Sequence, residues 1–228
     1  MATHARTGAS WTGCTMIDES RAWVPPIPLA LGVLSIALSW GLVLVYANTL
    51  AFGVALAWIH VLALGGFTTI ALAVLIHAIP AFTDLTWRGK PAARIAGVIV
   101  PLGAFGLAAS FALQSALGVG IFAIVSASAI GVYAAAALAT LTQHTQDRTE
   151  AAIARALWFV IFMLVCTAAF GVVLGIAYAS GNGEALRVAP AHAALGIVGW
   201  LTLLTMGISA RTFRPLLGAS SRARMLHI

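Results

Sequence analysis

The chain alternates long apolar runs with short polar stretches, and six of the runs are long enough to form membrane-spanning helices. A spanning helix needs about 20 predominantly apolar residues. The pattern therefore predicts an all-α integral membrane protein built as a six-helix transmembrane bundle. The expected spans are residues 24–47, 50–82, 93–114, 118–141, 153–179 and 190–217.

The polar stretches divide the chain into one membrane domain with two tails. We expect a cytoplasmic N-terminal tail at residues 1–22, a six-span bundle at 23–218 and a basic cytoplasmic tail at 219–228. The connections at 83–91 and 142–150 are polar, and the one at 180–188 is rich in glycine. No sizeable soluble domain fits between these segments.

Composition agrees with this class of protein. The 228 residues are 61% hydrophobic and 8% charged, and the mean hydropathy is +1.02, which excludes an ordinary soluble globular domain. The net charge of +6 could suggest a nucleic-acid partner. In a membrane protein, however, basic residues report first on orientation, so we expect the lipid bilayer and no nucleic acid.

The basic residues are distributed unequally between the two sides that the span count predicts. One side has Arg187 as its basic residue, whereas the other has eleven: Arg6, Arg21, Arg88, Lys90, Arg94, Arg148, Arg155, Arg211, Arg214, Arg222 and Arg224. Positive residues accumulate on the cytoplasmic side. We therefore expect both termini inside, and the first halves of spans two and six near the outer face.

Histidine is the candidate centre of chemistry, because the predicted spans contain no Asp or Glu. Proton-coupled transporters usually place a carboxylate there. His60 and His192 fall at matching depth on two parallel spans. Cys14 and Cys166 lie in different environments and have no metal-binding spacing.

The helix faces below these two histidines suit a porphyrin. Gly196 and Gly199 follow His192 on one helical face, where small residues leave a flat recess. Phe67 lies on the corresponding face below His60. Neutral imidazole is a common axial ligand of haem iron, so this arrangement predicts one haem between the two spans. The alternative is that each histidine only hydrogen-bonds a neighbouring helix.

Two further residues extend the hypothesis. His77 lies 17 residues beyond His60, about 25 Å along the helix, so it cannot share the same haem. We favour a structural role for His77, with a second haem site as the alternative. Arg187 could pair with haem propionates, although Glu184 close by could neutralise it instead.

The two histidine segments resemble helices of the haem-copper oxidase subunit I superfamily, and are closest to its divergent oxidase-like branches, including NnrS-like proteins. The segments are HVLALGGFTTIALAVLIHAIP at 60–80 and HAALGIVGWLTLLTMG at 192–207. The resemblance implies that His60 and His192 hold a low-spin haem, in a bacterial inner (cytoplasmic) membrane. The chain has half the spans of a complete oxidase subunit, and no His-x-x-x-Tyr motif or adjacent histidine pair for copper.

The expected function is electron transfer by a membrane-bound b-type cytochrome, and not oxygen reduction by a complete oxidase. A quinol, a periplasmic cytochrome or another redox subunit would be its partner, and the chain could form a homo-oligomer. One alternative is haem-based sensing or handling of nitric oxide or oxygen. Another is a cofactor-free small transporter or assembly factor, and a copper ion on the two histidines ranks last because two ligands are too few.

Overall fold

The computed structural model describes residues 25–49, 51–143 and 148–216, with side chains described up to residue 209. This part of the chain is helical and contains no strand. The predicted tails at 1–22 and 219–228 lie outside the described residues, as do Cys14 and the basic residues of both tails. The helices are α2 (Pro26–Thr49), α3 (Phe52–His60), η1 (Val61–Thr68), α4 (Thr69–Thr83), α5 (Lys90–Ala112), α6 (Ala116–Leu141), α7 (Arg148–Ser180), η2 (Ala185–Val188), α8 (Ala189–Ala194), η3 (Leu195–Thr202) and α9 (Leu203–Leu216).

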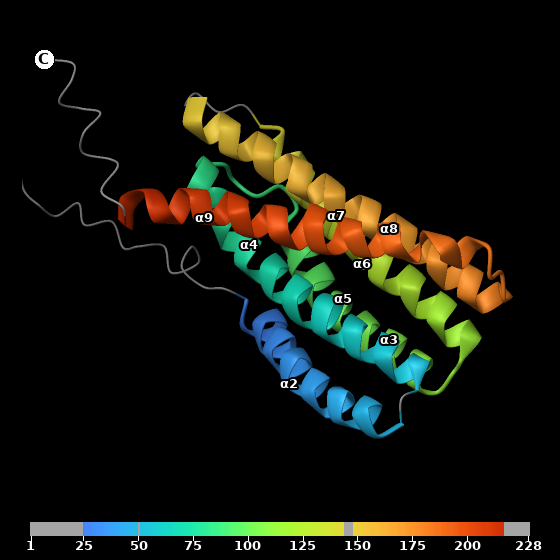
Figure 1. Ribbon diagram of the computed structural model, residues 1–228. Coiled ribbons are helices and arrows are strands. Elements are labelled where there is room, and N and C mark those ends of the chain that lie inside the picture. Colours follow the sequence, from blue (N-terminus) through green and yellow to red (C-terminus); the bar gives the residue numbers. More distant parts are fainter. Residues whose placement is uncertain (1–24, 50, 144–147, 217–228) are drawn as a thin grey trace, which may run out of the picture.

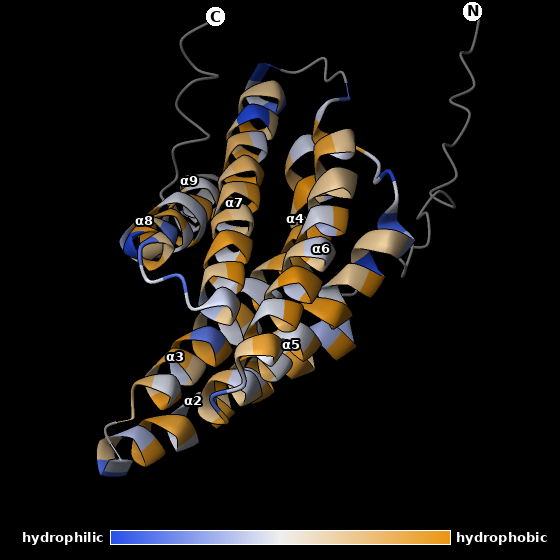
Figure 2. Ribbon diagram, turned by 90° about the vertical axis from the view of Figure 1, so that its right-hand side faces the viewer, coloured by the Kyte–Doolittle hydropathy of each residue, from blue (hydrophilic) through white to orange (hydrophobic). Residues whose placement is uncertain are grey.

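Six helical stretches in the described residues are long and apolar enough to cross a membrane, which confirms the predicted number of spans. They are Pro26–Thr49, Phe52–Thr83, Lys90–Ala112, Ala116–Leu141, Arg148–Ser180 and Ala185–Ser209. The second comprises α3, η1 and α4, and the sixth begins with η2, α8 and η3. Hydrophobic residues cover the helices and hydrophilic ones gather near their ends (Figure 2). The chain is therefore a multi-pass membrane protein.

The helices form one elongated bundle in which α3, α4 and α5 are central, whereas α2 and the last span lie on the outside (Figure 1). Burial follows this arrangement. Half of the second span's most apolar window is buried, compared with 22% for the first span and 11% for the sixth. The sixth span packs chiefly on α7, whereas α3 and η1 pack on α2 and α5. His60 and His192 thus lie on two spans whose main packing partners differ.

Small residues allow the helices to approach closely. A Cβ added to Gly175 of α7 would lie 2.5 Å from the Cβ of Ala123 in α6, so glycine is required there. Close backbone approach supplies the van der Waals contact that holds helices together in lipid. The glycine-rich pattern of the sequence is therefore explained largely by helix packing.

The second and sixth spans are each interrupted by a π-helical segment, η1 in one and η3 in the other. In both, a threonine near the C-terminal end donates its hydroxyl to the carbonyl five residues earlier. Thr69 bonds Leu64 at 3.1 Å, and Thr202 bonds Ile197 at 2.8 Å. π-Helical turns are rare and occur frequently at functional sites. Here both follow a histidine, His60 directly and His192 after two residues.

A second irregularity, Pro80 inside α4, is compensated by the connection to α5. Proline has no N–H, so the carbonyl of Ile76 loses its usual helical donor. The indole Nε1–H of Trp87 donates to that carbonyl at 2.7 Å instead. Trp87 also packs edge-on against Tyr133, whose hydroxyl bonds the carbonyl of Leu72 at 2.7 Å. These contacts fix α4 against α6.

Candidate functional site

The structure brings His60 and His192 together, although they are far apart in the sequence. Their ring centroids are 6.5 Å apart and the rings are nearly parallel, with an interplanar angle of 16°. Direct aromatic contacts have centroid separations of about 4.5–7 Å, so this pair lies at the long end of that range. Metal–imidazole bonds of about 2 Å on opposite sides of one metal ion separate the centroids by roughly 6 Å. The spacing therefore suits a shared metal.

In each histidine, one ring nitrogen is hydrogen-bonded to a backbone carbonyl. Nδ1 of His60 lies 2.7 Å from the carbonyl oxygen of Leu56, and Nδ1 of His192 lies 3.0 Å from that of Thr167. A carbonyl can only accept, so each Nδ1 carries the proton and each Nε2 presents a lone pair. Among the described residues, no hydrogen bond engages either Nε2. This is the arrangement that orients histidine as a metal ligand.

The surroundings of the two rings are apolar and close-fitting. The His60 ring packs on Phe111 of α5, with centroids 5.1 Å apart. Phe111 in turn meets Tyr178 of α7 at 5.5 Å. On the other side, a Cβ added to Gly171 would lie 3.2 Å from Cε1 of His192. Phe111 and Gly171 thus restrict the orientation of the rings.

A hydrogen bond deeper in the bundle also joins the two histidine spans. Nε1 of Trp200 donates to Oγ1 of Thr68 at 3.1 Å, and both residues are buried. Trp200 lies eight residues beyond His192, and Thr68 lies eight beyond His60. The two spans therefore run parallel and in register, as the sequence predicted.

The two glycines of the expected porphyrin recess face α7 instead. A Cβ added to Gly196 would meet Thr167, and one added to Gly199 would meet the side chain of Met163. Phe67 is 47% exposed, and its place beside a porphyrin stays a prediction. The expected faces assumed α-helical periodicity throughout, but η1 and η3 have a longer hydrogen-bonded repeat. Thr68 and Trp200, which lie within these two segments, bond one another across the two spans.

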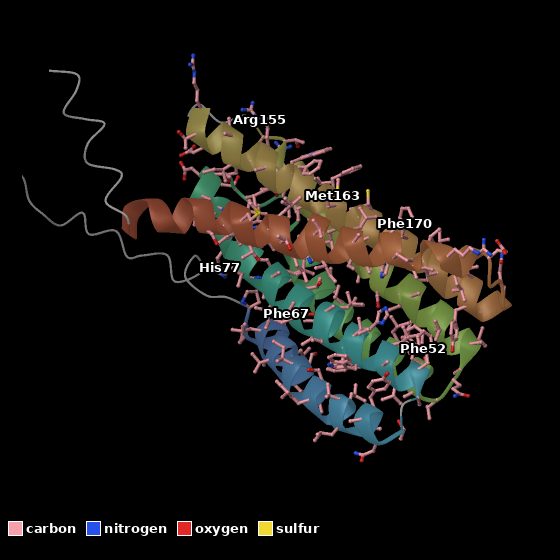
Figure 3. All side chains as sticks on the ribbon, viewed as in Figure 1. Phe52, Phe67, His77, Arg155, Met163 and Phe170 are labelled. Carbon is pink, nitrogen blue, oxygen red and sulfur yellow. The ribbon has the colours of Figure 1, made fainter. Side chains whose placement is uncertain are left out.

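Arg187 and His77 lie away from the ring pair. Arg187 forms an ion pair with Glu184 at 3.3 Å, on a surface where both side chains are 78% exposed. This ion pair is the alternative to an Arg187–propionate pair. His77 lies in α4, towards the end of the bundle opposite to Phe52 (Figure 3). It is therefore separate from the site formed by His60 and His192.

The sequence did not predict the contacts that hold the two histidines, and only some of these contacts could have been inferred from it. Nothing in a sequence identifies the carbonyls of Leu56 and Thr167 as acceptors, because every residue has one. Trp200 offered a usable signal, since tryptophan in a membrane protein usually lies at the interface and this one falls inside a span. Thr167 and Gly171, one helical turn apart on α7, form the surface that meets His192.

The residues present fit a haem better than a bare metal ion. No group of three or more His, Cys, Asp or Glu side chains that could hold a metal occurs within residues 25–49, 51–143 and 148–209. Two imidazoles alone make a weak site, whereas a porphyrin brings four equatorial nitrogens and needs only axial ligands. The imidazoles of His60 and His192 would each supply one such ligand through Nε2, because Nδ1 of each bonds a carbonyl.

Neither a protein-family model, nor a curated protein sequence, nor a solved structure matches this chain. The fold and site themselves define a multi-pass α-helical membrane protein with two facing histidines in adjoining spans.

Proposed function

We propose that the chain is a membrane-bound b-type cytochrome in which His60 and His192 are the axial ligands of one haem b. The observation that carries the proposal is the ring pair itself, with centroids 6.5 Å apart and each Nδ1 on a carbonyl. A histidine that served only as a helix contact would not require a facing partner. Two of them, each with an Nε2 lone pair, would each supply one donor atom to the same iron.

The chain's own residues would orient the ligands and exclude water. The carbonyls of Leu56 and Thr167 fix the tautomer and make each imidazole a stronger donor. Phe111 and Gly171 limit ring rotation. When bound, the haem supplies one-electron exchange, because two histidine ligands leave no open position on iron.

The proposed role is therefore electron transfer at the outer side of a bacterial inner membrane. Its support is the charge distribution. Arg88, Lys90, Arg94, Arg148 and Arg155 belong to the α4–α5 connection and to the N-terminal parts of α5 and α7. These segments lie towards one end of the described bundle, whereas η2, which contains Arg187, lies beside α8 towards the other end (Figure 1). With the basic end inside, both termini are cytoplasmic and the histidine pair lies nearer the outer face. A quinol, a periplasmic cytochrome or another redox subunit would exchange electrons with it.

The test is the optical spectrum of the purified protein, expressed with ample haem and recorded oxidised and reduced. We expect a low-spin haem b spectrum in the wild type. His60→Ala and His192→Ala should each lose the haem or convert it to high spin, because each removes one axial bond. His77→Ala is the matched control, a membrane histidine outside the site, and should keep the wild-type spectrum.

Other outcomes would select the alternatives. A colourless wild-type protein would support a cofactor-free transporter or assembly factor and overturn the proposal. Carbon monoxide binding to the reduced wild type would favour a haem-based sensor of nitric oxide or oxygen, with one histidine dissociating. Retention of the low-spin spectrum in both alanine variants at 60 and 192 would show that the ligand assignment is wrong.

A further inference from the structure

A buried polar contact connects the two histidine spans below the site. The indole Nε1–H of Trp200 donates to the hydroxyl of Thr68 at 3.1 Å. Trp200 is 1% exposed and Thr68 is 4% exposed, so neither group can exchange this partner for water. In the apolar interior of a membrane protein, an unsatisfied donor or acceptor is costly. The bond therefore resists any sliding that would separate these two side chains.

The position of the contact links it to the histidines. Thr68 and Trp200 each lie eight residues beyond a histidine, so the two spans are joined at equivalent levels. Each of the two residues lies inside the π-helical segment of its span. The π geometry is supported locally by Thr69 and Thr202, which bond carbonyls five residues earlier. If one span slid along the other at Thr68 and Trp200, the imidazole rings of His60 and His192 would shift relative to one another by a similar amount.

Trp200 also lies within a large buried hydrophobic cluster of the bundle. The same cluster includes Leu72 of α4, Ile130 of α6 and Leu164 of α7. Thr68 is held by η1, which packs on α2 and α5. The hydrogen bond thus joins η1 of the second span to η3 of the sixth span, the two spans that carry the histidines.

We infer that Thr68 and Trp200 are positioning residues that set the register of the second and sixth spans and so hold His60 and His192 at the same depth. The effect on haem ligation rests on the proposed function, whereas the effect on helix register does not. Among the described residues, no hydrogen bond or aromatic ring contact joins either side chain to the two imidazoles. They act through the helices that carry the two histidines.

The test compares Thr68→Val, which keeps the shape and removes the hydroxyl, with Thr68→Ser, which keeps the hydroxyl. Trp200→Phe removes the indole donor and serves as a second variant if Thr68→Val fails to fold. The first readout is the optical spectrum of the full-length protein. The second, independent of haem, is the distance between spin labels on Phe52→Cys and Ala191→Cys, at exposed positions of α3 and α8, with Cys14 and Cys166 replaced by serine.

We expect Thr68→Val and Trp200→Phe to shift or broaden the label distance and to lose low-spin haem bands. Thr68→Ser should restore the wild-type result in both readouts. A wild-type label distance in Thr68→Val and Trp200→Phe would overturn the inference, even if the wild type binds haem. If the wild type contains no haem, the proposed function fails alone, and the label distances still decide the role of Thr68 and Trp200.

Discussion

At the scale of single residues, the site depends on how each imidazole uses its two nitrogens. Nδ1 of His60 bonds a carbonyl in its own helix, whereas Nδ1 of His192 bonds Thr167 of the neighbouring α7. The second bond ties His192 to a helix outside its own span. Outer-sphere contacts of this kind orient a metal ligand and contribute to its affinity. Backbone acceptors also cannot be removed by a side-chain substitution.

Gly171 offers a way to disturb His192 without altering it. Gly171→Val should displace the ring, because even a Cβ at this position would lie 3.2 Å from Cε1. Overpacking typically costs about 1–3 kcal/mol, so we expect roughly a 5- to 150-fold loss of haem affinity. Haem titration of the apoprotein measures it.

Gly131→Val is the control for this substitution. Gly131 is exposed on α6, and a Cβ there would meet nothing within 4 Å. It carries the same change in side-chain volume and the same loss of glycine, so it should bind haem as the wild type does. Equal affinity in the two valine variants would refute the assigned role of Gly171.

At the scale of helices, apolar length predicted the number of spans and their approximate limits, and matching depth predicted that His60 and His192 would meet. Both features depend on bulk properties of the sequence, namely hydrophobic run length and residue count. Which side chains share a face with each histidine was harder to predict, because a π-helical turn changes the number of residues per turn. Gly196 and Gly199 accordingly face α7, while Thr68 and Trp200 join the two spans. Hydrophobic periodicity does not indicate where η1 and η3 begin.

At the scale of the whole molecule, the two ends of the bundle differ in charge. Five basic side chains of the described residues lie towards the end where α4 joins α5 and α7 begins, and one, Arg187, lies at the other. Arg187 is paired with Glu184, which leaves that end nearly neutral. The membrane potential and the insertion machinery both favour retaining the basic end inside. The proposed orientation therefore has the histidine pair on the outer side.

Single cysteines test this orientation. In a background with Cys14 and Cys166 replaced by serine, Gly183→Cys should react with a membrane-impermeant maleimide added to intact cells. Thr86→Cys, at an exposed position in the connection between α4 and α5, should react only after the membrane is opened. The reverse labelling pattern would place the termini outside and contradict the proposed orientation.

The most direct measurement of the central claim is low-temperature electron paramagnetic resonance of the oxidised, purified wild-type protein. Two histidine ligands predict a low-spin ferric signal, and the 16° angle between the rings predicts that its anisotropy is rhombic. A haem-free protein, or a ferric haem with only a high-spin signal, would contradict axial ligation by both His60 and His192.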